Sequence, residues 1–419
     1  MRIFEHRKEK DEAERNFLLF LCVVAAVALG QTLGLGGSIA SNFFRDSYDV
    51  TAFVRGMIEF PREIPGILCI VVVAYLSSRS DIFIAMVAQI LCGVSVIFLG
   101  LFTPSFGVML AFLAMYSFGM HMFFPLQESI GLKISGNNST AGATMGRVKS
   151  IALICTMLAS IAIYLGFKGG FFTFKTPVKW VFLVSAGFYA IALILLFFLQ
   201  RRVSKMRKRP REKKRKFVFK RKYAKFYILA TLSGAQKQMM TVFGTWVMVS
   251  ILTKGADYMA ILVFLGSFIG IYFTPFVGRW TDKFGIKKIL FLDAFTYIIV
   301  YLAYGFVTWG FVSGRLIKGG IPLILMSSIF VADAMSTQIG MVRTVYLNGI
   351  LDKKEDLTPT LALGISFDHI LAIICAFGGG YIWAQFGAQW IFFIAASMSV
   401  GNLLVASSIK QTVKRGADG

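Results

Sequence analysis

Charged residues are scarce in this chain, and acidic residues are the scarcest of them. Only 16% of the 419 residues are charged, with 21 Asp and Glu against 44 Lys and Arg, while 57% are hydrophobic. A soluble chain of this length normally has about a quarter of its residues charged and divides into two or more domains. Here the charged residues also lie mainly between long apolar blocks. This distribution excludes a disordered chain, a coiled coil and an ordinary cytosolic enzyme, and it indicates a polytopic membrane protein.

Cysteine and histidine are also few, which removes several kinds of site. The five cysteines lie inside apolar stretches, without disulfide or metal-ligand spacing, so we expect buried and inert thiols. The three histidines form no metal-binding pair, and no Ser/His/Asp set can be placed at one membrane depth. No nucleotide-binding loop is present either. The sequence therefore predicts no enzymatic activity, no metal site and no cofactor.

Long apolar runs are what the chain has in abundance. A helix needs about 20 mainly apolar residues to cross about 30 Å of hydrocarbon. The sequence predicts twelve such helices, near residues 17–41, 52–77, 82–102, 106–130, 147–166, 180–199, 226–252, 258–277, 286–307, 320–342, 359–384 and 388–409. These runs are too long and too uniform to be the strands of a membrane barrel.

Lysine and arginine are distributed unequally between the loops. If the N-terminus is cytoplasmic, the inner segments hold 34 of the 44 Lys and Arg, and the outer loops hold 7. Basic loops stay on the cytoplasmic side, so we expect both termini in the cytoplasm and a plasma or inner membrane location. The first fifteen residues are highly charged and do not resemble a cleaved secretory signal, so the first span is expected to remain in the mature protein.

A basic segment divides the chain into near-equal halves. Fifteen Lys and Arg lie in 201–225, which we expect to attract anionic lipids rather than nucleic acid. The predicted organisation is a cytoplasmic tail (1–16), an N-terminal six-helix bundle (17–200), the basic linker (201–225), a C-terminal six-helix bundle (226–409) and a cytoplasmic tail (410–419). This is an all-α integral membrane fold whose two bundles are related by a parallel pseudo-two-fold repeat.

One local motif follows the eighth predicted span. Its residues are Gly278, Arg279, Asp282, Lys283, Gly285 and Lys287. The motif resembles the loop signature of the major facilitator superfamily, in which glycines permit a tight turn beside an acidic and basic pair. Asp282 is placed to cap a helix or to pair with a cation across the bundle interface. The first-half copy, residues 74–81, has Ala74 and Ser78 where the family has Gly and Asp, so we do not expect the usual latch there.

The resemblance to a twelve-span secondary transporter of this superfamily extends over the whole topology. In that family the first, fourth, seventh and tenth spans line a central cavity, and the second and eleventh contribute to the contact between the halves. The resemblance thereby implies six possible cavity residues, which are Lys237, Gln236, Gln31, His121, Glu128 and Asp333. It places Asp368 and the charges of the second span at the sliding interface. The Gly-Pro motif of drug–proton antiporters is missing from the fifth span, which counts against a drug pump.

Charged residues within the spans are functional candidates by default, because burying them in a bilayer is costly. In the second span, Arg55, Glu59 and Arg62 share one helical face and are spaced to pair along the helix, with Glu63 beside them. These four residues either form an internally neutralised packing or gating network, or they act on substrate or protons.

Four other ionisable residues, and Glu59 again, receive separate expectations. Lys237 lies near mid-depth without an ionic neighbour in its own helix, so we expect it to face water, a carboxylate or substrate. Asp368 and Glu59 are the candidate proton carriers. Glu128 is expected at a helix end or gate, and Asp293 is expected to pair with the basic loop beside it.

The sequence thus predicts a secondary active transporter that works by alternating access. Its expected partners are a small anionic or zwitterionic molecule and a proton or other coupling ion, and the protein is expected to be monomeric. Two alternatives remain open on the same fold: a flippase or exporter of lipids and amphiphiles, and a sensor that transports nothing.

Overall fold

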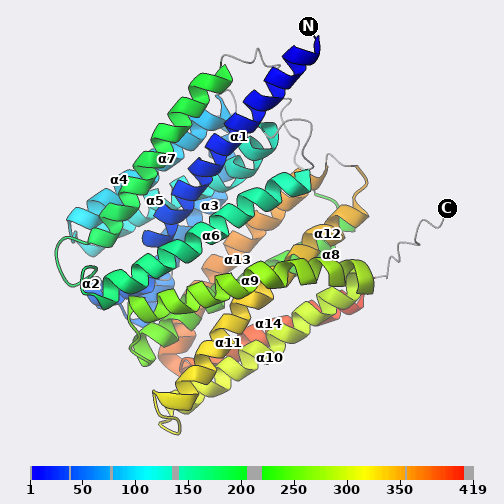
Figure 1. Cartoon of the computed structure of the whole chain (residues 1–419). Helices are drawn as coiled ribbons and strands as arrows, with labels where there is room; N and C mark the ends of the chain where they lie inside the picture. The colour runs from blue at the N-terminus through cyan, green and yellow to red at the C-terminus, as the bar shows by residue number, and fades with distance from the viewer. Residues whose placement is uncertain are drawn as a thin grey trace. The chain divides into compact units, whose positions relative to one another are not determined.

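The computed structural model describes residues 2–36, 39–75, 79–134, 141–204, 219–353 and 356–409, and its regular elements there are all helical. Figure 1 shows the helices in chain order. They are α1 (Arg2–Leu33), α2 (Ile39–Tyr48), α3 (Ala52–Tyr75), α4 (Asp81–Leu101), α5 (Phe106–Ile134), α6 (Ala141–Lys168), α7 (Trp180–Ser204), α8 (Ala224–Met239), α9 (Ala256–Phe284), α10 (Ile286–Val312), α11 (Gly320–Ile339), α12 (Met341–Ile350), α13 (Leu357–Phe386) and α14 (Gln389–Ser407).

Ten helices in the described part of the chain are long and apolar enough to cross a membrane. The other two predicted spans correspond to α3, which carries four charged residues, and to α8, which ends at Met239 and continues as two π-helical turns, Met240–Gly244 and Val247–Ile251. The all-α multi-pass fold is confirmed, with the count of twelve spans holding approximately.

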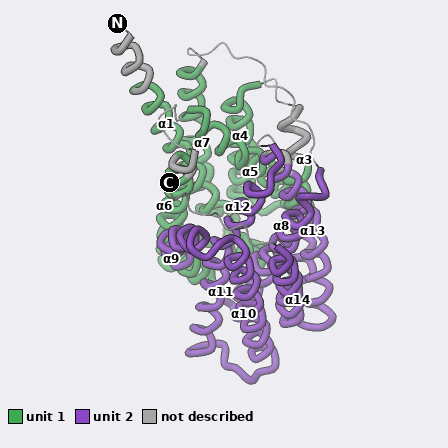
Figure 2. The backbone as a smooth tube through the Cα atoms, turned by 90° about the vertical axis from the view of Figure 1, so that its right-hand side faces the viewer, with its two compact units in different colours: residues 1–49, 61–213, 255–264 green, residues 50–60, 214–254, 265–419 purple. Residues whose placement is uncertain are grey.

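The chain forms two compact units, coloured separately in Figure 2. Unit 1 comprises residues 1–49, 61–213 and 255–264, and unit 2 comprises residues 50–60, 214–254 and 265–419. Two short pieces are assigned differently from the rest of their halves of the chain. The first turns of α3 pack within unit 2, and the first turns of α9 pack within unit 1. The basic linker as the boundary between two bundles stays a prediction, since residues 205–218 lie outside the described ones.

The same helix pairings occur in each unit. In unit 1, α1 packs against α6 and α7, and α4 packs against α5 and α7. In unit 2, α8 packs against α13 and α14, and α10 packs against α11 and α14. Counting spans from the start of each half, the first pairs with the fifth and sixth, and the third pairs with the fourth and sixth. This is the parallel repeat that the sequence predicts.

The first predicted span is shorter than the apolar run that encodes it. The expected end at residue 41 is wrong, because α1 stops at Leu33 and a separate helix, α2, begins at Ile39. Glycine explains the break. A Cβ at Gly34 would lie 2.8 Å from the Ser185 hydroxyl, and one at Gly36 would lie 3.1 Å from the Tyr116 hydroxyl. The backbone therefore turns where only glycine fits.

A buried lysine closes one end of unit 1. The Lys179 side chain is fully buried, and its ammonium donates to the carbonyl oxygens of Phe102 (3.4 Å) and Pro177 (3.0 Å) and to the hydroxyl of Thr103. Three acceptors match the three donors of an ammonium group. Burial lowers the pKa of Lys179 from its ordinary value, because it penalises the charged form.

An ionic cluster joins the end of the basic linker to the segment between α12 and α13. Lys220 contacts Asp356 (2.6 Å) and Asp352 (3.1 Å), and Lys222 contacts Asp352 (2.5 Å). The Tyr223 hydroxyl donates to Asp356 at 2.9 Å. These contacts lower the pKa of both aspartates, and the hydrogen bonds to them raise the pKa of Lys220. Two of the linker's lysines are therefore held by protein carboxylates.

Unit 2 contains one very close approach between helices. A Cβ on Gly56, in α3, would overlap the carbonyl oxygen of Ala376, and one on Gly380 would lie 3.0 Å from the carbonyl oxygen of Phe53. The rings of Phe53 and Phe377 lie 5.9 Å apart beside this contact. Glycine on both helices lets their backbones touch, which is a common way for membrane helices to pack.

Gly56→Ala is expected to lower the free energy of unfolding by about 1–3 kcal/mol, because the new methyl group overlaps a backbone atom that cannot move alone. The midpoint of thermal unfolding in detergent measures the effect. Gly378→Ala, on the same α13, is the matched control, since no atom lies within 4 Å of a Cβ placed there. Equal destabilisation by the two variants would contradict the close-approach account.

Candidate functional site

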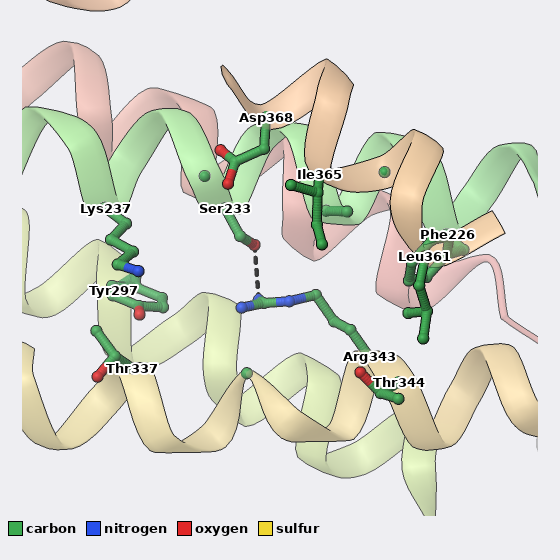
Figure 3. Close-up of a pocket in the computed structure, with 14 residues that line it drawn as sticks. Phe226, Ser233, Lys237, Tyr297, Thr337, Arg343, Thr344, Leu361, Ile365 and Asp368 are labelled. Carbon is green, nitrogen blue, oxygen red and sulfur yellow. Dashed lines mark hydrogen bonds between the residues drawn. The ribbon is translucent and has the colours of Figure 1, made fainter. Parts of the chain in front are cut away.

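A cavity of about 270 Å³ lies within unit 2, between α8, α10, α11, α12 and α13. Figure 3 shows the side chains that line it. One part of the wall is apolar and includes Phe226, Leu361 and Ile365. The polar lining consists mainly of Ser233, Lys237, Tyr297, Thr337, Arg343 and Asp368. Two cations and one carboxylate therefore share a space of small-molecule size.

Lys237 is the cation with the greatest freedom in this cavity. Its side chain is exposed although it lies in the last turn of α8, within the predicted seventh span, and in Figure 3 it extends toward Tyr297. Its ammonium makes no hydrogen bond or ion pair with any residue that the structure describes. Asp333, buried on α11, is close enough to interact with it electrostatically. The lysine thus faces water or a bound molecule, as one of the outcomes expected from the sequence.

Arg343 is the second cation, and its position depends on a helix break. Helix α11 ends at Ile339 and α12 begins at Met341, with Gly340 between them. A Cβ at Gly340 would meet the Arg343 guanidinium, so glycine leaves room for that side chain. Nη1 of Arg343 donates to Oδ2 of Asp293 at 2.8 Å and to the hydroxyl of Ser233 at 2.6 Å.

The ion pair corrects one expectation and adds one residue. Asp293 was expected to pair with the basic loop beside it in sequence, yet its partner is Arg343, fifty residues away. The carboxylate is nearly buried, with 5% of its side chain exposed, against 16% for Arg343. A buried carboxylate is costly unless a cation lies close to it. The basic residues beside Asp293 in sequence lie at the start of α10, and Arg343 is the cation that contacts the carboxylate. Arg343 was not among the predicted site residues, although a lone arginine in the tenth span indicates it.

A second layer of hydrogen bonds lies behind Arg343. Ser233 also accepts from Nδ2 of Asn402 (3.3 Å), which donates to Oε1 of Gln236 (3.2 Å) as well. Nε2 of Gln236 in turn donates to the hydroxyl of Ser399 (2.6 Å). Gln236 is fully buried against α14, so the structure places it behind the cavity and not on its wall.

Asp368 reaches the cavity because α8 carries a glycine opposite it. A Cβ at Gly234 would overlap the Asp368 carboxylate, and both residues line the cavity. Figure 3 shows this carboxylate above Ser233, facing the same space as the two cations. The structure thus brings Asp368 and Lys237 to one cavity, although the resemblance assigned them to different surfaces.

The charges of α3 form a buried pair with a polar partner. Arg55 Nη1 lies 2.5 Å from Glu59 Oε1, with at most 2% of either side chain exposed, which is the along-helix pairing that their spacing predicts. Glu59 also accepts from Nε2 of Gln238 at 2.9 Å. Arg62 is half-buried and Glu63 is buried further along α3.

The remaining candidates lie in unit 1. His121 is half-buried, and its Nδ1 lies 2.8 Å from the backbone oxygen of Ser117 and 3.1 Å from the hydroxyl of the same residue. Gln31 is half-buried near the end of α1, and Glu128 is exposed on α5. Gln31 therefore comes from α1, and His121 and Glu128 come from α5.

The loop motif is mostly helical in the structure. Gly278, Arg279, Asp282 and Lys283 lie in the last turns of α9, and Lys287 lies in the first turn of α10. The tight turn is confirmed at Gly285, which has a φ of 83°. Asp282 as a helix cap is wrong, because Gly285 occupies the cap position of α10 and no side chain bonds there.

The corresponding place in unit 1 holds an ion pair that the sequence did not predict. Asp81 accepts from Lys133 at 2.6 Å and from the Ser129 hydroxyl at 2.8 Å, which joins the start of α4 to the end of α5. The sequence indicated this pair only through its two members. Asp81 ends the first-half motif, and Lys133 follows the fourth predicted span. Residues 76–78 of that motif lie outside the described ones.

The comparisons agree with the fold. The sequence profile of the Major Facilitator Superfamily matches residues 18–347. Among solved structures, the nucleoside transporter NupG superposes with a TM-score of 0.70 at 12% identity, over 96% of this chain and 100% of that one. No curated protein sequence matches the chain.

Two further solved structures are similar to this chain. A D-xylose-proton symporter has a TM-score of 0.67 at 14% identity, over 94% of this chain and 97% of that one. An autoinhibited POT family peptide transporter has a TM-score of 0.74 at 10% identity, over 96% and 98%. At these identities the likeness concerns the fold alone.

Removing one partner of the Asp293–Arg343 pair should be costly. Arg343→Met is expected to lower the free energy of unfolding by about 3–5 kcal/mol, because it leaves a buried carboxylate without its cation. Lys237→Met is the matched control, as it removes a cation from the same cavity without breaking an ion pair between described residues. Thermal unfolding in detergent compares the two, and a double variant Arg343→Met/Asp293→Asn should regain part of the loss. An Arg343→Met protein as stable as Lys237→Met would contradict this reading.

Proposed function

This chain belongs to the major facilitator superfamily, and from that premise we propose that it moves a small anionic or zwitterionic solute across a membrane, coupled to protons. The observation that carries the proposal is the Lys237 ammonium, which is exposed in the unit 2 cavity without an ion-pair partner among the described residues. A carboxylate or phosphate group of a solute supplies the missing partner. Arg343 adds a second positive charge on the opposite wall.

The size and chemistry of the cavity support a small solute. Its volume of about 270 Å³ is slightly below the roughly 300–1,000 Å³ that is usual for small-molecule sites, which favours a small solute. Asp368 lines the same cavity, and its carboxylate is suited to contact the ammonium group of a zwitterion. The apolar side chains of Phe226, Leu361 and Ile365 can pack against the carbon skeleton. The structurally similar proteins are described as transporters of nucleosides, xylose and peptides, so the fold itself does not select among solutes.

The proximity of Asp333 to Lys237 supports the proposed proton coupling. The carboxylate is buried on α11, and its charged form is stabilised by the nearby Tyr301 hydroxyl and by the field of Lys237. When an anionic solute neutralises Lys237, Asp333 loses that support and takes up a proton, because an isolated charge in a low-dielectric site is costly. Release of the solute restores the field and expels the proton. Solute and proton are thereby moved together by alternating access.

The distribution of charge also supports a proposal for the membrane location and orientation of the protein. We place the protein in a plasma or inner membrane, as a monomer with both termini cytoplasmic. The part of the basic linker that precedes Lys220 is available for anionic lipid in this proposal, while Lys220 itself contacts aspartates. Gln31, His121 and Glu128 in unit 1, and the Arg55–Glu59 pair in unit 2, are kept as candidates for gating or for the solute pathway.

The test uses purified protein in liposomes that contain a pH-sensitive dye. Separate pools of small carboxylates, phosphate esters, amino acids and cationic metabolites are added outside. We expect an anionic or amino-acid pool to drive proton movement, with loss of at least roughly tenfold in Lys237→Ala, since a desolvated charge contact is worth about 2–5 kcal/mol or more. Lys237→Arg should regain part of the flux. Lys288→Met, at an exposed lysine of α10, is the control for loss of one positive charge.

Asp333→Asn separates binding from coupling. This variant is expected to exchange labelled solute across the membrane while moving no protons with it, because an amide cannot be protonated at neutral pH. Full proton movement in Asp333→Asn would exclude Asp333 as the carrier and transfer that role to Asp368 or Glu59. Absence of flux with every pool, from protein that unfolds cooperatively, would favour the flippase or sensor alternatives.

A further inference from the structure

Helix α10 carries a row of polar side chains on one buried face. The row consists of Asp293, Tyr297, Tyr301, Tyr304 and Thr308, at steps of four, four, three and four residues, which an α-helix brings onto one side. All five are buried, with at most 4% of each residue exposed. The row is about 22 Å long at 1.5 Å per residue, which is most of the hydrocarbon thickness. A buried helix face of this length is normally apolar in a membrane protein.

Several polar atoms along this row lack a protein partner. Oδ1 of Asp293, the hydroxyl of Tyr301 and the hydroxyl of Thr308 are buried and have no hydrogen-bond partner among the described residues. Oδ1 of Asp333, which faces the row from α11, also has no hydrogen-bond partner in position among the described residues, although the Tyr301 hydroxyl lies close enough to stabilise the charged form of this carboxyl group. Buried polar atoms in native proteins are almost always satisfied by protein or by ordered water. Such atoms occur at both ends of the row, at Asp293 and Thr308, and in its middle, at Tyr301 and Asp333, and this distribution is what a file of internal water would satisfy.

The row also has defined ends. Tyr297 lines the unit 2 cavity, so this end meets the space that contains Lys237. Thr308 lies one turn before the end of α10 at Val312, on the side that the charge distribution predicts to be external. Between them, the Tyr304 hydroxyl donates to the carbonyl oxygen of Gly244, in the π-helical turn that follows α8. The row thus runs from the unit 2 cavity toward one end of α10 and stops at the fully buried Thr308.

We propose that a file of internal water along this face of α10 is a proton path that loads Asp333 from the Thr308 end, apart from the route of the solute. The proposal rests on the proton coupling proposed above. Each hydroxyl or water accepts one proton and passes one on, and the last transfer forms the O–H bond of the Asp333 carboxyl group. No carbon bond changes, and charge is balanced because one proton enters for each carboxylate neutralised.

The charged groups around the row fit a path that ends at Asp333. Asp293 is occupied by Arg343, so it is held as a carboxylate beside the path. Lys237 is the cation that acts on Asp333, and the three tyrosines are neutral relays near neutral pH. Helix α14 and the π-helical turn Val247–Ile251, which also pack on α10, contain no ionisable side chain. Asp333 is therefore the acceptor in this neighbourhood whose charge the solute controls.

Hydroxyl-radical footprinting of the purified full chain tests for the water itself, without any solute. Radicals formed from bound water label nearby side chains even when bulk solvent cannot reach them. Tyr301 is expected to be labelled several-fold faster than Tyr189, although both are buried. Tyr189 is the matched control, because its hydroxyl is already satisfied by Tyr116 at 2.9 Å in unit 1. Equal protection of Tyr301 and Tyr189 would overturn the water file.

Transport by two hydroxyl-deleting variants tests the proton path. Tyr301→Phe and Thr308→Val are expected to slow proton uptake with the anionic pool by roughly tenfold or more, because a positioned proton-transfer group contributes about that much or more. Exchange of labelled solute, which needs no net proton movement, should stay within about twofold of wild type. Thr231→Val, whose hydroxyl bonds to its own helix at Tyr227, is the control.

The outcomes separate this proposal from the function on which it rests. Normal proton uptake in both variants would overturn the path while leaving proton-coupled transport in place. Loss of both proton uptake and exchange would also overturn it, since the residues would then act on binding or folding. Absence of transport in the wild type would remove the proposed function, and footprinting would still decide whether the water file exists.

Discussion

The cost of an unpaired charge in hydrocarbon governs how this chain is built. Where a charged side chain lies within the membrane, the surrounding sequence supplies a partner at close range. Arg55 and Glu59 form an ion pair along α3, and Gln238 donates a hydrogen bond to the other carboxylate oxygen of Glu59. Arg343 and Asp293 pair between two helices, with Ser233 as a further acceptor. Lys237 and Asp333 depart from this pattern, because neither forms an ion pair with a described residue. Lys237 lines a cavity, so the constraint that explains the pairs also identifies the candidate site.

The parts of this arrangement that follow from local sequence could be predicted from it. Apolar runs predicted the all-helical multi-pass fold, in which ten described helices are long and apolar enough to span, and the spacing of Arg55 and Glu59 predicted their ion pair. Lys237 was expected to face water or a partner, because its own helix offers none, and its exposed side chain lines the unit 2 cavity. The Asp293–Arg343 pair was missed, since its members are fifty residues apart and no local spacing relates them. Gln236 was misplaced for a related reason, because the packing of α14 decides which face of α8 is buried.

Glycine has two kinds of role here, and only one is readable from a motif. Gly285 adopts a positive φ between α9 and α10, as a turn-forming glycine in a loop signature predicts. Gly34, Gly56, Gly234 and Gly340 instead make room for a neighbour from a distant part of the chain. Their importance depends on what approaches them, so it becomes visible only when the packing is known. This is also why the end of α1 and the break before α12 were not found from hydropathy.

The π-helical turns that follow α8 have a further geometric consequence. A π turn accommodates an additional residue relative to an α turn, so each one rotates the following side chains by about 100° around the helix axis. Two such turns, Met240–Gly244 and Val247–Ile251, lie between Lys237 and the end of this span. Residues at the two ends of the span therefore do not lie on the faces that a continuous α-helix would give them. The helical face on which Lys237 lies is not continued by the residues near Ile251. The two π-helical turns between them change the direction in which those later side chains point.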